Sequence, residues 1–134
     1  MFIALLSWFT FAEATTPVHL KNPSCPERCL GYLENDFTIV PPDAVKKFDE
    51  ELAKEGGVQS LLVTVVKLDG AVEFSVGGTV LSERNLIDPK TATYQVAVPE
   101  AALDRGVEIS ITNLGRNSPV WELSIEGSSK PLEF

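Results

Sequence analysis

The stretch that most constrains the fold is Val58–Val80, with the sequence VQSLLVTVVKLDGAVEFSVGGTV. Its segment Leu61–Val66 is apolar at almost every position, which is typical of a strand covered on both faces. The pair Asp69-Gly70 is favoured in two-residue hairpin turns, because both turn positions need a positive φ. After this pair, apolar and polar residues alternate over Val72–Val76, as in a strand with one wet face. The stretch therefore predicts a central antiparallel hairpin with the rest of the domain packed around it.

One helix is expected, over Asp43–Glu55. Charged residues fill one side of this segment, and Asp43 is placed to cap the first turn. The apolar stripe of the helix is expected to cover one face of the strand Leu61–Leu68. This stripe consists of Val45, Phe48 and Leu52.

Further strands are predicted by alternating polarity, and Gly77-Gly78 permits a bulge or bend between them. Pro99–Arg105 is expected to form a short helical turn or a loop. Together these patterns predict a mainly β fold: an antiparallel two-sheet β-sandwich, similar to a jelly roll, of about seven strands with one α-helix. The additional strands are expected at Phe37–Val40, Tyr94–Val98, Val107–Thr112 and Trp121–Glu126.

The segment Tyr94–Thr112 (YQVAVPEAALDRGVEISIT) resembles a recurring piece of galactose-binding-like jelly rolls, in which a strand leads into Pro, a short apolar turn, Gly and a second strand. Trp121–Glu126 (WELSIE) is similar to their closing strand. The resemblance covers about a quarter of the chain. It implies a carbohydrate-binding or accessory module of an exported enzyme, with ligand loops at one end and frequently a structural calcium. The helix at Asp43–Glu55 departs from the usual pattern, and no ligand motif of the family transfers residue by residue.

The N-terminal segment Met1–Ala14 is expected to be a signal peptide. Its apolar run of ten residues, Phe2–Phe11, is too short to span a bilayer, and Ala12-Glu13-Ala14 offers small residues for cleavage after Ala14. No Lys or Arg precedes the run, so a buried N-terminal strand is the alternative. The segment predicts a secreted or periplasmic protein.

A Pro-rich arm, Thr15–Leu33, is expected next, followed by a sandwich domain over residues 34–127 and a tail over 128–134. Cys25 and Cys29 are expected to form a small disulfide, since a redox pair normally has two intervening residues and His19 is the only histidine for a metal site. The arm is expected to make non-local contacts, with its own chain or with a partner. A calcium site at Glu34-Asn35-Asp36 would need more ligands.

Charge and motifs argue against several functions. A net charge of −8 disfavours nucleic acid and anionic membranes, because both need clustered Lys and Arg. The chain has no nucleophile elbow, no zinc-protease motif and no dinucleotide fingerprint. We therefore expect no enzyme activity, no cofactor and no metal site.

Two polar loops are the candidate ligand sites, Asn113–Pro119 and Ser82–Pro89, although the same residue types are common in ordinary turns. Trp121 is expected in the core. The expected function is an exported non-catalytic binding module for carbohydrate or another extracellular ligand. The alternative is a structural or protein-interaction subunit of an extracellular assembly, as an oligomer or with another protein. The candidate ligand residues are Asn113, Arg116, Asn117, Arg84 and Asn85.

Overall fold

The strand pairs of this chain nest inside one another. In the computed structural model, which describes residues 15–21, 36–115 and 119–132, β1 pairs with β9, β2 with β8, β3 with β7 and β4 with β5, all antiparallel. The chain thus resembles one long hairpin that has been rolled up, with its tip between β4 and β5. This rolling produces two packed sheets in the arrangement of a jelly roll.

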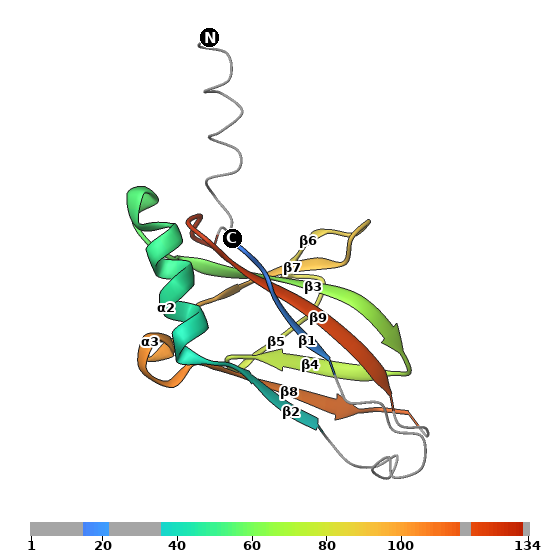
Figure 1. Cartoon of the computed structure of the whole chain (residues 1–134). Helices are drawn as coiled ribbons and strands as arrows, with labels where there is room; N and C mark the ends of the chain where they lie inside the picture. The colour runs from blue at the N-terminus through green and yellow to red at the C-terminus, as the bar shows by residue number, and fades with distance from the viewer. Residues whose placement is uncertain (1–14, 22–35, 116–118, 133–134) are drawn as a thin grey trace.

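Nine strands are described, two more than the sequence predicted. The first sheet has the order β1-β9-β3-β7-β6 and the second the order β2-β8-β4-β5 (Figure 1). The strands of the first sheet are β1 (Val18–Lys21), β9 (Val120–Ser128), β3 (Ser60–Asp69), β7 (Thr93–Ala97) and β6 (Leu86–Asp88). Those of the second are β2 (Asp36–Val40), β8 (Val107–Asn113), β4 (Val72–Val76) and β5 (Thr79–Val80).

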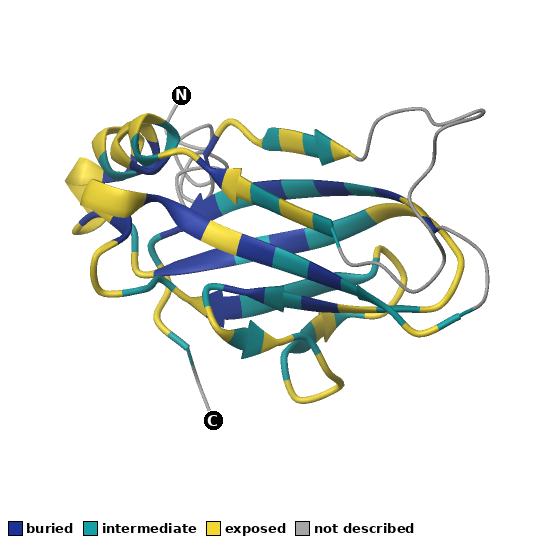
Figure 2. Cartoon of the chain, turned by 90° about the horizontal axis from the view of Figure 1, so that it is seen from below, coloured by how far each residue is buried: buried dark blue, intermediate teal, exposed yellow. Residues whose placement is uncertain are grey.

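The core lies between the two sheets, where alternate residues of each strand point inward. In β8 and β9, the apolar positions of the alternating pattern are buried and the intervening polar positions face outward (Figure 2). The predicted β-sandwich is therefore confirmed. The buried residues of these two strands include Val107, Ile109, Ile111, Trp121, Leu123 and Ile125.

The helix expected at Asp43–Glu55 is α2 (Pro42–Glu51), continued by a 3₁₀ turn, η1 (Ala53–Glu55). Asp43 lies in its first turn but does not cap it, because the helix begins one residue earlier, at a proline. The expected apolar stripe, Val45, Phe48 and Leu52, is buried.

The stripe packs against the end of β9, and Val45 and Phe48 belong to the same core cluster as Leu61 and Val63 of β3. A Cβ added at Gly127 would lie 2.8 Å from the Cβ of Phe48, so β9 and α2 are in close contact there. A second short helix, α3 (Ala102–Arg105), packs beside α2. Because α2 and α3 each connect one sheet to the other, they close the same end of the sandwich, which we call the helix end (Figure 1).

The predicted hairpin of β3 and β4 is wrong. The two strands belong to different sheets, because β9 occupies one edge of β3 as far as Asp69, while β8 pairs with β4 from Val72 onward. Gly70, with a φ of +129°, lies in the short connection that crosses between the sheets. The two-residue hairpin turn is instead Gly77-Gly78, whose φ values of +58° and +89° suit a type I′ turn.

The opposite end of the sandwich, which we call the loop end, carries the connections that follow β3 and β8. The sequence predicts that Leu61–Val66 is covered on both faces, but at the loop end β3 is partly exposed. Leu61 and Val63 are fully buried, but Val66 and Leu68 are 54% and 43% exposed. A register shift between Val65 and Lys67 marks the change.

The described part of the Pro-rich arm makes non-local contacts with its own chain, as expected. Strand β1 pairs with β9, with Val18 opposite Ile125, and the Thr15 hydroxyl accepts a hydrogen bond from the Gly127 amide (2.9 Å). The sandwich therefore extends beyond the expected residues 34–127, to β1 on one side and Ser128 on the other. In the described ranges, no helix has the length and apolar character needed to span a membrane.

A chain that begins at residue 25, and so lacks Thr15–Ser24 and β1, should be less stable than one that begins at Thr15. Val18 and Leu20 would lose their partial burial against the core, which is worth about 2 kcal/mol in the free energy of unfolding. Thermal unfolding followed by circular dichroism should show a melting temperature lower by roughly 5–10 °C. Equal melting temperatures for the two chains would show that β1 does not contribute to stability.

Candidate functional site

Both sheets become narrower on the same side of the sandwich. In the first sheet, β7 pairs with β3 only as far as Thr93 opposite Thr64, so β3 continues toward the loop end without that neighbour. In the second sheet, β5 has two residues, which pair with Ser75 and Val76, so none of the described strands lies beside the start of β4 on that edge. A groove therefore opens between the two sheets.

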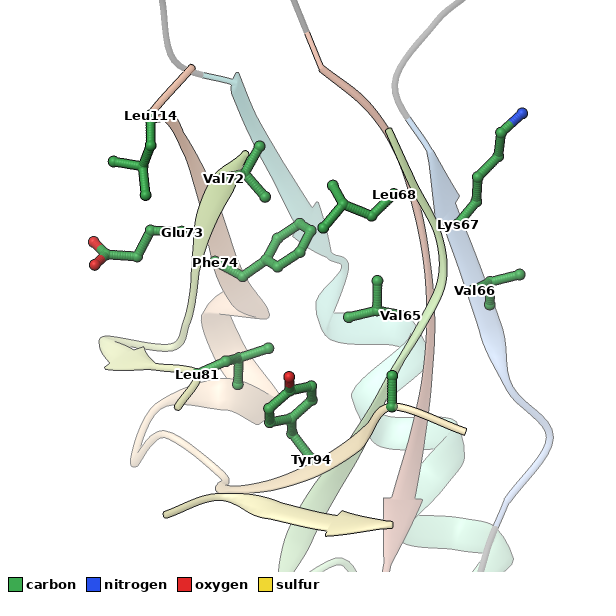
Figure 3. A pocket seen from close by; sticks show the side chains of 11 residues that line it. Val65, Val66, Lys67, Leu68, Val72, Glu73, Phe74, Leu81, Tyr94 and Leu114 are labelled. Atoms are coloured by element: carbon green, nitrogen blue, oxygen red, sulfur yellow. The ribbon is translucent and has the colours of Figure 1, made fainter. Parts of the chain in front are cut away.

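This groove has a volume of about 530 Å³, within the range of roughly 300–1,000 Å³ that is usual for small-molecule sites. Its walls come from the second half of β3, the first half of β4, and residues from the β5–β6, β6–β7 and β8–β9 regions. Figure 3 shows which lining side chains point into the common space and which point away. Those that point inward are Val65, Leu68, Val72, Phe74, Leu81 and Tyr94.

Apart from Tyr94, the side chains that point into the groove are apolar (Figure 3). Lys67 and Glu73 also line it, but their side chains point away from the centre (Figure 3). The Tyr94 hydroxyl is the polar group that points in, and no hydrogen bond joins it to another described residue. The groove is thus suited to an apolar group, with one hydroxyl able to bind a polar atom of the same ligand.

Two leucines give the mouth of the groove an exposed apolar surface. Leu68 of β3 is 43% exposed, and Leu114, which follows β8, is 64% exposed. Leu114 is held there because its amide donates to the carbonyl of Ala71 (2.8 Å), in the connection between the sheets. Clustered exposed apolar side chains beside an opening are typical of a binding surface.

The backbone of the groove wall also has an unusual conformation. Among the described residues, Ala92 is the one non-glycine residue with a positive φ, +56°. Its carbonyl accepts a hydrogen bond from the amide of Val65 (3.0 Å), which is the last link between β3 and the β7 side of the sheet. For a residue with a Cβ this conformation costs about 1–2 kcal/mol, and such costs are concentrated at functional sites.

One predicted ligand residue, Asn113, lies at this end of the groove. It is the last residue of β8, next to Leu114, and its side-chain oxygen accepts a hydrogen bond from the amide of Gly115 (2.9 Å). Arg116 and Asn117, the other predicted residues of this loop, lie outside the described residues. The structure therefore brings one end of the predicted loop to the groove.

The second predicted loop has a structural role. The side-chain oxygen of Asn85 accepts hydrogen bonds from the amide and hydroxyl of Ser82, at 3.2 and 3.3 Å, and its amide nitrogen donates to the carbonyl of Gln95 (3.5 Å). These bonds connect the turn after β5 to β7. Arg84, in the same turn, has an exposed side chain. The connection supplies Leu81 to the groove, a residue that the sequence did not indicate.

Three other predictions concern residues outside the groove. Trp121 is in the core, as expected, and its indole nitrogen donates a hydrogen bond to the carboxylate of Asp36 (3.0 Å). Cys25 and Cys29, which we predict to form a disulfide, lie outside the described residues. Over the described ranges, no group of three or more His, Cys, Asp or Glu side chains is placed to hold a metal ion.

The outer face of the first sheet is polar and separate from the groove. Thr64 and Thr93 share a hydrogen bond of 2.8 Å there, and Glu126 lies on the same face, paired in register with Leu62. Burial raises the pKa of the Glu126 carboxyl above its ordinary value, because the charged form loses hydration.

Replacement of Glu126 by Gln should therefore raise stability at neutral pH. Ionising Glu126 costs more in the folded chain than in the unfolded one, so the charge destabilises the fold at pH values above the folded pKa. Below the ordinary value of 4.5, both states become protonated and the difference between the two proteins should disappear. Melting temperatures of wild type and Glu126→Gln across this pH range measure the effect. A difference that did not depend on pH would contradict it.

Comparison with known proteins does not identify a ligand or a function for this groove. No protein-family model, no curated protein and no solved structure matches the chain. The similarity of Tyr94–Thr112 to galactose-binding-like jelly rolls therefore stays a prediction, and a functional proposal depends on the sequence and on the geometry described above.

Proposed function

We propose that this protein is a non-catalytic binding module, which takes an apolar group of its ligand into the groove between its two sheets. The observation that carries the proposal is the apolar groove of about 530 Å³. Ligand sites are commonly concave clefts of this size that are lined mainly by apolar side chains. An open groove of this size, left by the two-residue β5 and by a β7 that begins only at Thr93, supports a role in binding.

The ligand class that fits best is an amphipathic molecule with one apolar chain, such as a fatty acid. The inward walls offer hydrocarbon and aromatic surface, which favours burial of CH₂ groups at about 0.8 kcal/mol each. Tyr94 offers one hydroxyl for a polar atom. Export, which Met1–Ala14 predicts, would place the ligand outside the cell or in the periplasm.

The lining supports binding rather than chemistry. Lys67, Glu73 and Tyr94 are its ionisable residues, and the first two point away from the space where a ligand would lie (Figure 3). General acid–base catalysis needs a titratable side chain held within hydrogen-bond reach of the proton that moves, and no hydrogen bond links Tyr94 to another described side chain. We accordingly propose no cofactor, metal or enzyme activity.

A carbohydrate is the second candidate ligand, and the position of Asn113 favours it. This residue adjoins the groove mouth, so the loop that contains the predicted Arg116 and Asn117 begins beside Leu114. A sugar needs several hydrogen bonds as well as an apolar surface, and this loop is the place where the sequence supplies them.

Replacement of Leu68 by Asp should weaken the binding of an apolar probe. The new carboxylate would lie at the mouth and would have to lose hydration on binding, which should raise the dissociation constant of anilinonaphthalene sulfonate at least about tenfold. Fluorescence titration measures this constant, and competition with saturated fatty acids of graded chain length tests the proposed ligand class.

The matched control is Ile87→Asp. Ile87 has a similar exposure, 53%, and does not line the groove. This variant should bind the probe as the wild type does. Equal binding by the Leu68→Asp and Ile87→Asp proteins, or no binding by the wild type, would contradict the proposal.

Carbohydrate binding should depend on the loop after β8. A glycan array probed with wild type and with the Arg116→Ala/Asn117→Ala double variant separates the two ligand classes. Signals that disappear in the double variant would support the carbohydrate candidate. An array without signals, together with binding of the fatty acids, would leave the apolar ligand as the function.

A further inference from the structure

Strand β2 (Asp36–Val40) is an edge strand with an exposed apolar surface. It ends the order β2-β8-β4-β5, and within the described ranges no strand pairs with its other edge. Phe37 and Ile39 point to the outer face of the sheet and are 77% and 43% exposed. On this outer face, the neighbour of Phe37 on β8 is Ser110, and the next residue across the sheet, on β4, is Ser75. Because both are small, they leave the phenyl ring uncovered.

The sequence of β2 is complementary to itself. If two copies of β2 pair antiparallel about a two-fold axis at Thr38, residue 37 of one copy lies opposite residue 39 of the other. Phe37 would then meet Ile39 of the second copy on the same outer face, and the reciprocal pair would form at the same time. No charged side chain of β2 would lie on that face, since Asp36 points inward and accepts the hydrogen bond from Trp121.

From this register we propose that β2 is a homodimer interface, through which a second copy of this chain extends the sheet. Two four-stranded sheets then become one continuous eight-stranded sheet, with β2 next to β2 at its centre. The backbone groups on the open edge of β2 find partners, and the exposed Phe37 and Ile39 cover one another.

The interface and the groove are independent. The groove lies between β3 and β4, on the β5 side of the second sheet, whereas β2 forms the opposite edge of that sheet. Pairing of β2 would therefore leave both grooves of the dimer open. Because a strand pair of five residues buries a small area, the dimer should be weak and should form at high protein concentration.

Sedimentation velocity of the full chain, over a wide range of concentrations, tests the proposal. The wild type should shift from monomer to dimer as the concentration rises. Phe37→Lys should raise the dissociation constant of the dimer at least about tenfold, because it replaces the central apolar contact with a charge. Since Phe37 is so exposed, this variant should keep the wild-type melting temperature and the wild-type affinity for anilinonaphthalene sulfonate.

The matched control is Val80→Lys, an exposed position on the outer face of the same sheet but on its opposite edge. This protein should dimerise as the wild type does. A wild type that is monomeric at every concentration would overturn the proposal. So would a dimer that Phe37→Lys and Val80→Lys weaken equally, because another surface would then form it.

Disulfide cross-linking tests the register itself. Two Thr38 residues on the two-fold axis would have Cα atoms about 4.5–5.5 Å apart, a separation that a disulfide can bridge. Under mild oxidation, Thr38→Cys should give a covalent dimer well above the wild-type background, and Thr79→Cys, on β5, should not. Equal cross-linking of the two variants would show that the proposed register is wrong.

Discussion

The pairing of β3 with β9 is the interaction on which the rest of the structure depends. It runs from Ser60 opposite Ser128 to Asp69 opposite Val120, and brings the closing strand of the chain into the centre of the first sheet. Strand β1 pairs with the outer edge of β9, and α2 packs on its end through Gly127. Strand β7 pairs with the other edge of β3 as far as Thr64, and β4 pairs with β8 in the second sheet, so the chain crosses between the sheets directly after β3.

Elements whose pattern is set by burial could be predicted from the sequence. The alternation in β7, β8 and β9 and the helical spacing of Val45, Phe48 and Leu52 each report which side chains face the core, and these elements are present. The β3–β4 hairpin was inferred from a local signal, Asp69-Gly70, and long-range partners overrode it. Strand β1 could not be predicted because its pattern is short and its stability comes from β9, which is more than a hundred residues away.

The groove could not be predicted because it results from where strand pairing stops. No residue type identifies Leu68, Leu81 and Tyr94 as neighbours; they meet because β5 has two residues and β7 begins at Thr93. The two ends of the sandwich thereby have different properties. At the helix end, α2 and α3 close the core, which supplies stability and allows the loop end to stay partly open. The predicted Asn113 lies at that open end, whereas Asn85 is used to hold a turn.

A comparison of the four sheet edges explains why β2 differs from the others. Edge strands in soluble proteins are normally protected from pairing by short length, bulges, Pro or charged side chains. Three of the edges here have such protection: β5 has two residues, β6 has a register shift and is followed by Pro89, and β1 follows Pro17 and ends with the charged Lys21. Strand β2 is also followed by prolines, Pro41 and Pro42, but with five residues it is the longest of the four edge strands. It pairs with β8 in an uninterrupted register and has Phe37 and Ile39 on its open face. Because the longest edge strand is also the one with two exposed apolar side chains on one face, a strand that pairs there explains this exposure better than chance does.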